Sequence, residues 1–392
     1  MWLYLIIFFI PVLYYSFTKI RENRDVPFLA IFLLVLSLFV GFSDMFGGYD
    51  RYIYGEMFDN VADITTVKGS YIKSGIFSMY FTGEFGYALL NILISFITEN
   101  RYIFILIVTL IIYSCLYLSL KKYAEDYPMA IIMFLGLWFF FSFTYLRQVL
   151  SATIVWLGIQ YVVEHKFWKF LLISLIGFSI HNSAIIFFPL YFIPIKKFSP
   201  KTVIRVLFLL FLLGISPIPN FLFEIYGSNS IIERRSDYNA SDGLRMPYIL
   251  ESFLFAYLIL KNYNQLPNDK VHIVLMNMAL IFCGILLFFV RSENGGRLSW
   301  YYIIGVITTI TLICSYKNNI RNKVPVFIIV LCLFLYLRIY IGWQAYLNLY
   351  PYKTFFSNGF REGDYSWENY EYNHAYDEDK FCRDAFRFTL NF

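Results

Sequence analysis

Apolar residues along this chain gather in long runs, which short polar segments separate. The runs span residues 2–18, 27–42, 84–98, 102–120, 128–143, 147–163, 167–180, 184–195, 202–222, 247–260, 271–290, 299–315 and 324–342. Most are roughly 15–22 residues long, which is the length that a helix needs to cross the hydrocarbon core of a bilayer. The pattern predicts an all-α polytopic membrane protein.

The composition supports a membrane protein. Of 392 residues, 59% are hydrophobic and 15% are charged, and the mean hydropathy is +0.59. A soluble domain could not bury so much apolar surface with so few charges. The five cysteines are not spaced like a disulfide framework or a zinc site, and no nucleotide-binding motif or repeat is present, so no metal or other cofactor is expected. The net charge of +5 lies in short loops and does not indicate a nucleic-acid partner.

Basic residues in short connections predict the orientation of the chain. They occur in "KIRENRD", "KKYAEDY", "EHKFWK", "PIKKFSPK", "KNYNQLPNDK" and "YKNNIRNK". The positive-inside rule places all of these in the cytoplasm, which requires that one early run does not cross. The run 84–98 follows a long polar segment and contains Glu84 and Asn91, so we expect an interfacial or re-entrant helix on the outer side. About twelve crossings remain, with both termini outside; the alternative is that 84–98 is a weak ordinary span.

Arginine and lysine are distributed unequally between the two predicted sides. The cytoplasmic side holds twelve lysines and four arginines, whereas the outer side holds four lysines and twelve arginines. A guanidinium binds phosphate or carboxylate in a bidentate manner and keeps its charge near apolar surroundings. The distribution favours an anionic ligand on the outer side, although pairing with loop carboxylates would give the same count.

The segment "FTYLRQVLSATIVWLGIQYVVEH" places Arg147 and Gln148 at the outer end of a predicted span. The positive end of the helix dipole points the same way, and both features favour an anion there. Charged residues at membrane depth are costly and tend to mark sites or pathways. The simpler interpretation is an arginine that snorkels to the interface.

A histidine interrupts the next apolar stretch, "GFSIHNSAIIFFPLY". The runs 167–180 and 184–195 are short, and they predict either a tight helix pair bent around His181 or one broken helix. His181 would then face the outer side, where a neutral imidazole could act as a general base. The simpler interpretation is a hydrogen-bonded packing residue.

Asp50 and Arg51 follow a glycine pair in "GGYDRYIY", just after an outer helix end. The aspartate is either an acid–base group or an ordinary turn residue. Arg51 beside it is a further candidate for binding an anion.

Two later outer segments supply more arginines. "RSENGGRLSWYY" places Arg291 and Arg297 at the outer mouths of two spans, with glycines that allow a tight turn between them. The loop 223–246, which contains Arg234, has a charge density more typical of a solvated loop. Together, these residues fit a cavity open to the outside, with arginines for a diphosphate and an acid or imidazole for proton transfer.

The order of these motifs resembles the EpsG family, bacterial membrane proteins of exopolysaccharide, capsule and O-antigen loci. The motifs are "GGYDRYIY", "EFGYALLNILI", the stretch from "FTYLRQ" to "FFPLY", "GGRLSWYY" and "YPYKTFF". The resemblance covers about residues 40–356, and the "LRQ…A…H.SA" pattern is its most specific part.

The resemblance implies a Wzy-type oligosaccharide repeat-unit polymerase with an architecture related to the GT-C membrane glycosyltransferases. An important acid in an early outer loop and a following juxtamembrane helix are implied, and Asp50 and the run 84–98 match them. The residues that match the family in type are Arg147, Gln148, His181, Ser183, Arg297 and Tyr352. The implied partners are a polyprenyl-diphosphate-linked donor and acceptor and the bilayer, with a chain-length regulator as a candidate. The active site would face outward from the bacterial plasma membrane.

Two regions follow from this organisation. Residues 1–356 form a membrane-embedded polymerase domain with outer loops at 43–101, 223–246 and 291–298. Residues 357–392 form a polar tail on the outer side, rich in aromatic and acidic residues and longer than the family pattern needs.

The chemistry expected from these residues is glycosyl transfer. An acceptor hydroxyl attacks the anomeric carbon of the donor, arginines stabilise the leaving diphosphate, and His181 or Asp50 takes the proton, with a slight preference for His181. A flippase or transporter for the same lipid would also need an arginine-lined cavity, but should show two related halves. A membrane acyltransferase would need its histidine on the cytoplasmic side, whereas a glycan ligase would use closely similar chemistry.

Overall fold

A computed structural model describes residues 1–18, 24–45, 48–79, 83–219, 221, 243–292, 295–316, 323–344, 349–357 and 383–387. All regular elements within these ranges are helices, beside one isolated antiparallel bridge between Ser43 and Thr354. In chain order they are α1 (Trp2–Phe17), α2 (Val26–Gly41), α3 (Tyr49–Thr66), α4 (Ile76–Met79), α5 (Phe85–Ser95), α6 (Arg101–Tyr123), α7 (Tyr127–Leu137), α8 (Phe141–Thr144), α9 (Leu146–Trp156), α10 (Ile159–Val163), α11 (Phe167–Ile180), the 3₁₀ helix η2 (Asn182–Phe192), α12 (Pro200–Ile215), α15 (Met246–Lys261), η3 (Tyr263–Gln265), α16 (Lys270–Phe288), η4 (Gly295–Tyr302), α17 (Ile303–Tyr316) and α18 (Lys323–Gln344).

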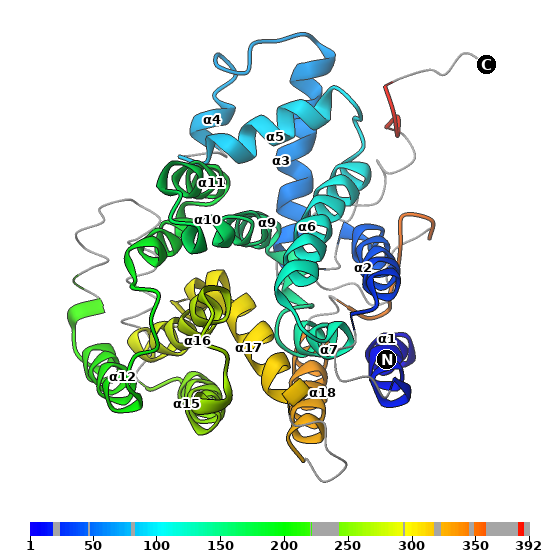
Figure 1. Cartoon of the computed structure of the whole chain (residues 1–392). Coiled ribbons are helices and arrows are strands. Elements are labelled where there is room, and N and C mark those ends of the chain that lie inside the picture. The colour runs from blue at the N-terminus through cyan, green and yellow to red at the C-terminus, as the bar shows by residue number, and fades with distance from the viewer. Residues whose placement is uncertain are drawn as a thin grey trace.

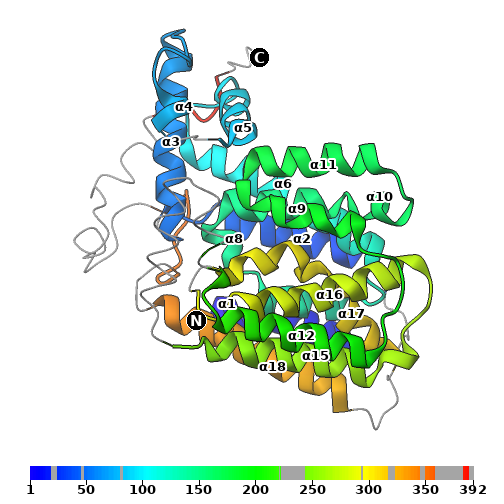
Figure 2. The same ribbon diagram turned by 90° about the vertical axis from the view of Figure 1, so that its left-hand side faces the viewer.

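The apolar runs form a bundle of roughly parallel helices, seen nearly end-on in Figure 1 and from the side in Figure 2. Five described helices are long and apolar enough to cross a membrane, namely α6, α9 with α10, α16, η4 with α17, and α18. Shorter apolar helices, among them α1, α2, α7 and α11, complete the bundle. The chain is therefore an all-α, multi-pass membrane protein, as predicted. The number of twelve crossings stays a prediction.

One end of the bundle carries an additional layer. Figure 2 shows α3, α4 and α5 gathered beyond one end of the parallel helices, where the N-terminus also lies, while the turn from α10 to α11 lies at the other end. We call the first of these the α3 end. The basic segment "EHKFWK" belongs to the α10–α11 turn, so the predicted topology places the α3 end outside the cell.

Helix α3 was not predicted, because the sequence suggested a long outer loop over residues 43–101. Its 18 residues include several charged side chains, so it shows no continuous apolar run. It instead buries a stripe at helical spacing that includes Tyr54, Phe58 and Val61. The Thr144 hydroxyl of α8 accepts the Asp50 N–H at 2.9 Å, which satisfies a donor at the start of the helix.

Helix α5 is short and partly exposed, and its place as the interfacial helix expected from the sequence stays a prediction. Its 11 residues span about 16 Å, which is too short to cross a bilayer. It packs on α11 where Gly86 meets Ser179, since a Cβ atom at Gly86 would lie 2.1 Å from the Ser179 hydroxyl oxygen. Phe85, Leu89 and Leu93 remain exposed at i, i+4 spacing, as expected of a helix in the membrane interface.

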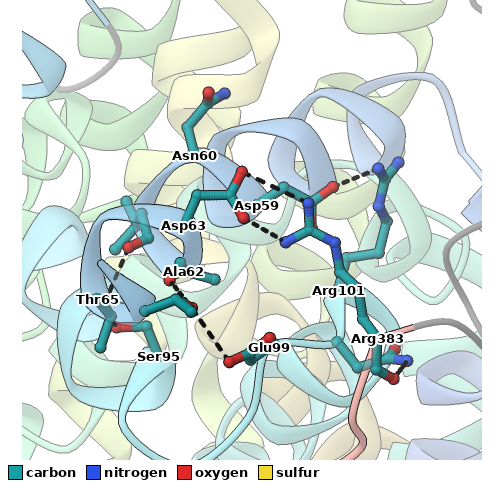
Figure 3. Close-up of polar contacts among 12 residues, drawn as sticks. Asp59, Asn60, Ala62, Asp63, Thr65, Ser95, Glu99, Arg101 and Arg383 are labelled. Atoms are coloured by element: carbon teal, nitrogen blue, oxygen red, sulfur yellow. Dashed lines mark hydrogen bonds and ion pairs between the residues drawn. The ribbon is translucent and has the colours of Figure 1, made fainter. Parts of the chain in front are cut away.

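Ion pairs hold α3 against the turn between α5 and α6. Figure 3 shows Asp59 and Asp63 in a row on α3, facing Arg101 and Arg383. Asp59 and Arg101 are both buried and form an ion pair, which makes the loss of either partner alone costly. Arg383 engages Asp63 through both of its terminal nitrogens, at 2.8 and 3.5 Å.

Arg387 extends this connection. Its guanidinium pairs with Glu99 at 2.5 Å and donates to the carbonyl oxygens of Ser95 at 2.7 Å and Ala62 at 3.0 Å. The described part of the predicted tail, residues 383–387, thus joins α3 to α5. The tail residues 358–382 and 388–392 lie outside the described residues.

Cysteine labelling tests the predicted orientation. In a Cys382→Ser background, a membrane-impermeant maleimide added to whole cells or spheroplasts should label Ser70→Cys, an exposed position after α3. It should not label Lys166→Cys, an exposed position in the α10–α11 turn, until the membrane is opened. Labelling of Lys166→Cys from outside would reverse the orientation.

Candidate active site

The break at His181 is the first element of the site. Helix α11 ends at Ile180, and His181 adopts an extended backbone before η2 begins. The Nδ1 atom of His181 accepts the backbone N–H of Ser183 at 3.2 Å, so the imidazole caps η2. Helices α11 and η2 pack against each other, which confirms the tight pair that the sequence predicted.

Glu84 joins three parts of the site. One carboxylate oxygen lies 2.5 Å from the Arg147 guanidinium of α9. The other accepts the Asn182 N–H at 3.4 Å and lies 3.8 Å from His181 Nδ1. Gly83 precedes it with φ +78, a conformation that L side chains rarely adopt. The glycine allows the chain to turn sharply and place Glu84 between α5, α9 and the α11–η2 break.

Aromatic rings surround the Arg147 guanidinium. It lies over the ring of Tyr54 from α3 at 5.2 Å and over the ring of Tyr87 from α5 at 5.8 Å. Within the described residues, its Nε atom is buried without a hydrogen-bond partner. These contacts fix a partly buried cation at the α3 end of α9.

Arg297 forms the other basic side of the site. Its guanidinium lies 4.1 Å from the centre of the Tyr145 ring and donates to the Tyr145 hydroxyl at 3.1 Å. The Gln148 side chain donates to the Arg297 carbonyl at 3.0 Å. Gln148 therefore positions η4 against α9. This bond links the helix that carries Arg147 to the helix that carries Arg297.

A chain of hydroxyl groups leads from His181 into the bundle. Ser183 Oγ lies 2.8 Å from His181 Nδ1 and 2.9 Å from the Tyr301 hydroxyl, which reaches Ser151 Oγ at 3.5 Å. The Trp156 indole donates to the Tyr301 carbonyl at 2.9 Å. Sequence reasoning missed Tyr301, because a tyrosine in an aromatic apolar run carries no distinctive signal.

Asp50 stands at the start of α3, close to both arginines. Burial raises the pKa of its carboxyl above the usual range, while the nearby charges of Arg297 and Arg147 partly oppose this shift. An acid with a raised pKa within range of two arginine charges is suited to exchange a proton with a bound ligand.

The structure thus brings together most of the residues that the sequence singled out. Those in the cluster are Asp50, Arg147, Gln148, His181, Ser183 and Arg297. Glu84 is the central residue that was not chosen as a site residue. Its signal was a lone acid between a polar segment and an apolar run.

Two predicted residues lie in a different place. Arg51 is fully buried and donates to the carbonyl oxygens of Gly41 and Ser43, each at 2.9 Å. The Tyr352 hydroxyl donates to the Phe39 carbonyl at 2.8 Å. Arg51 fastens α3 to the end of α2, and Tyr352 fastens the segment after α18 to α2, so the contacts of both residues are structural.

The remaining candidates contribute less to the cluster. Arg291 follows α16 and is half-buried. Arg234 lies outside the described residues. Within the part of the chain that the structure describes, no three His, Cys, Asp or Glu side chains group closely enough to hold a metal ion.

Comparison with known proteins gives one result. The sequence model of the EpsG family matches residues 26–354, which include every described element from α2 to α18. No curated protein and no solved structure shows significant similarity to the chain. Because the match covers most of the sequence and includes the whole cluster, this chain belongs to the EpsG family.

Proposed function

We propose that this protein polymerises oligosaccharide repeat units carried on polyprenyl diphosphate, at the outer face of the bacterial plasma membrane. Membership of the EpsG family suggests a polymerase of exopolysaccharide repeat units. The proposal adds the lipid carrier, the side of the membrane and the roles of individual residues. It also assigns an architecture related to the GT-C glycosyltransferases.

The observation that carries the proposal is the grouping of Asp50 with two arginines from separate elements: Asp50 is hydrogen-bonded to Thr144, and the neighbouring Tyr145 holds Arg297. Arg147 stands on α9 and Arg297 on η4, and the charges of both act on Asp50. A diphosphate leaving group gains negative charge in the transition state, and two fixed guanidinium groups stabilise that charge. A nearby acid supplies the group that takes the acceptor's proton.

The reaction can be assigned to these groups. The acceptor hydroxyl oxygen forms a bond to the anomeric carbon of the donor sugar, and the bond from that carbon to the diphosphate breaks. The diphosphate leaves with the electron pair beside Arg147 and Arg297. The hydroxyl proton moves to the Asp50 carboxylate.

The hydrogen bonds of His181 favour Asp50 as the base, which reverses the slight preference drawn from the sequence. Nδ1 accepts the Ser183 backbone N–H, so the lone pair of a neutral imidazole is already engaged and the proton lies on Nε2. His181 is therefore suited to donate a hydrogen bond to a substrate oxygen. Glu84, near Nδ1, and Ser183 orient the ring.

Replacement of Arg147 by lysine tests the need for a bidentate contact. Arg147→Lys keeps the charge but loses the planar fork, which should reduce polymer by about tenfold or more. Polymer length and amount are measured in a complemented deletion strain, with the protein quantified in the membrane. Arg205→Lys, at an exposed position in α12, is the matched control and should behave like the wild type. Full activity in Arg147→Lys would reduce Arg147 to an interfacial residue.

Two further substitutions separate the base from the orienting residue. In purified protein with lipid-linked repeat units, Asp50→Asn should lower turnover by about 10²–10⁴-fold and leave donor binding nearly unchanged. His181→Ala should retain a substantial rate, because it removes a hydrogen-bond donor and a helix cap. If His181→Ala is inactive and Asp50→Asn keeps most of its turnover, the roles are exchanged.

The pH dependence provides an independent test of Asp50. Arg297 lowers the pKa of Asp50, so its removal in Arg297→Gln should raise that pKa further. A base must be deprotonated to act, so the acidic limb of the kcat/KM profile should move to higher pH. Arg383→Gln removes a charge near the other end of α3 and should leave the limb in place. If the acidic limb of the kcat/KM profile of Arg297→Gln lies at the same pH as in the wild type, Asp50 is excluded as the titrating group.

A further inference from the structure

Glu84 stands between a fixed cation and a group that becomes a cation when it takes up a proton. Its Oε2 atom lies 2.5 Å from Arg147 Nη1, and its Oε1 atom lies 3.8 Å from His181 Nδ1. The first separation is that of a charge-assisted hydrogen bond, whereas the second exceeds hydrogen-bond distance. In the structure, the carboxylate therefore neutralises Arg147, and Nδ1 of His181 accepts the Ser183 N–H at 3.2 Å instead.

The contact with Glu84 uses only part of the Arg147 guanidinium. It engages Nη1, whereas Nε is buried without a hydrogen-bond partner among the described residues. A guanidinium presents several N–H donors in a planar fork, and a phosphate group satisfies that fork through more than one oxygen. Glu84 thus occupies, with one oxygen, the position that the proposed function gives to the lipid diphosphate.

Charge balance determines what happens to Glu84 when a diphosphate arrives. The charges of Arg147 and Arg297 are balanced by Glu84 and by an ionised Asp50. A diphosphate brings further negative charge and removes the cation from Glu84. A buried carboxylate without a partner is costly. His181 lies within reach of it, and an imidazole changes its charge near neutral pH.

The surroundings of His181 make Glu84 its only available carboxylate. Helix α5, helix α9 and η4 pack on the α11–η2 pair. The titratable groups on these five elements are Tyr87, Arg147, Lys169, Tyr191, Arg297, Tyr301 and Tyr302. None of these five helices contains an acid, and Glu84 stands at the N-terminal cap of α5. Any charge that stabilises a protonated His181 from these elements therefore comes from Glu84.

The hydroxyl chain beside His181 fits both protonation states. Ser183 Oγ lies 2.8 Å from Nδ1 and 2.9 Å from the Tyr301 hydroxyl. Beside a neutral imidazole, the Ser183 hydroxyl donates to Nδ1. Beside a protonated Nδ1, it accepts that proton's hydrogen bond and donates to Tyr301, whose hydroxyl donates to Ser151 Oγ at 3.5 Å. Hydroxyl groups rotate freely, so the chain reverses without moving its oxygen atoms.

We propose that Glu84 is an exchangeable counterion. A bound lipid diphosphate takes its place at Arg147, the released carboxylate pairs with His181, and Nδ1 takes up a proton from the solvent. A shift of roughly 1 Å brings Oε1 from 3.8 Å to hydrogen-bond distance of Nδ1. The identity of the anion as a lipid diphosphate rests on the proposed function. The exchange makes His181 a charged, stronger Nε2–H donor only when the diphosphate is in place.

Proton uptake on binding tests the exchange without any turnover. Full-length protein in nanodiscs is titrated calorimetrically with the diester farnesyl methyl diphosphate, in buffers of different ionisation enthalpy. The diester carries no group that titrates near neutral pH, so the uptake reports on the protein. At a pH of about 7.5 an unperturbed imidazole is about one-tenth protonated, so the wild type should take up close to one proton per diester bound. Nanodiscs without protein should take up none.

Two conservative variants should abolish the uptake. Glu84→Gln keeps an oxygen for the Asn182 N–H but loses the competing charge, so it should bind the diester several-fold more tightly and without proton uptake. His181→Asn keeps a capping oxygen for the Ser183 N–H and should also bind without uptake. The matched control is His165→Asn, at an exposed turn position with φ +55, which should behave like the wild type.

Two results would overturn the exchange. If Glu84→Gln binds more weakly and takes up the same proton as the wild type, Glu84 has a structural role only. Asp50 is the other acid that a diphosphate could protonate, and Asp50→Asn should keep the uptake. Uptake that disappears in Asp50→Asn and persists in His181→Asn assigns the proton to Asp50 instead.

The same titration separates this proposal from the proposed function. Binding that Arg147→Lys weakens, with no proton uptake in the wild type, would keep the anion site and remove the exchange. Proton uptake as expected, in a protein that makes no polymer from lipid-linked repeat units, would keep the exchange and remove the polymerase assignment. A wild type that does not bind the diester would contradict both.

Discussion

The ion pair between Arg147 and Glu84 is the interaction on which the rest of the site depends. A guanidinium at the end of a membrane helix needs an anionic or aromatic neighbour, because lipid cannot solvate it. Glu84 meets this need and also accepts the N–H at the start of η2 and approaches the His181 ring. One carboxylate thereby brings together α5, α9 and the break after α11. Its loss would leave Arg147 without its carboxylate and η2 without one of its acceptors.

The layer at the α3 end holds the second half of the site in place. Asp50 begins α3, and Tyr54 one turn later contacts Arg147. The other end of α3 is fixed to the α5–α6 turn by the Asp59–Arg101 pair and by Arg383 (Figure 3). Arg387 adds a bond to the Ala62 carbonyl. Because α3 and α5 are joined at this end, Asp50 and Glu84 at their N-terminal ends keep a defined separation. The C-terminal arginines thus support the site from a distance.

The sequence predicted the bundle well, because each long apolar run has the length and composition of a membrane helix. It did not predict α3, since charged residues interrupt its apolar stripe and the helix depends on the capping hydroxyl of Thr144 and on packing against α5 and α6. Arg147, Gln148 and His181 were identifiable because polar residues are rare in apolar runs. Arg51 was a candidate as an outer arginine beside Asp50, and Tyr352 as a match to the family pattern, yet both donate to backbone carbonyls. Side-chain type and spacing do not distinguish an arginine that faces a ligand from one that fastens two segments.

The central claim is that the cluster at the α3 end joins repeat units after they have reached the outer face. The lipid-linked glycan profile of a deletion strain, separated by membrane side, tests it most directly. A polymerase defect should leave single repeat units on polyprenyl diphosphate at the outer face, with no longer chains, and the wild-type gene should restore the ladder. Single units trapped on the cytoplasmic side would contradict the account and indicate a flippase, and lipid-linked chains of normal length without transfer would indicate a ligase.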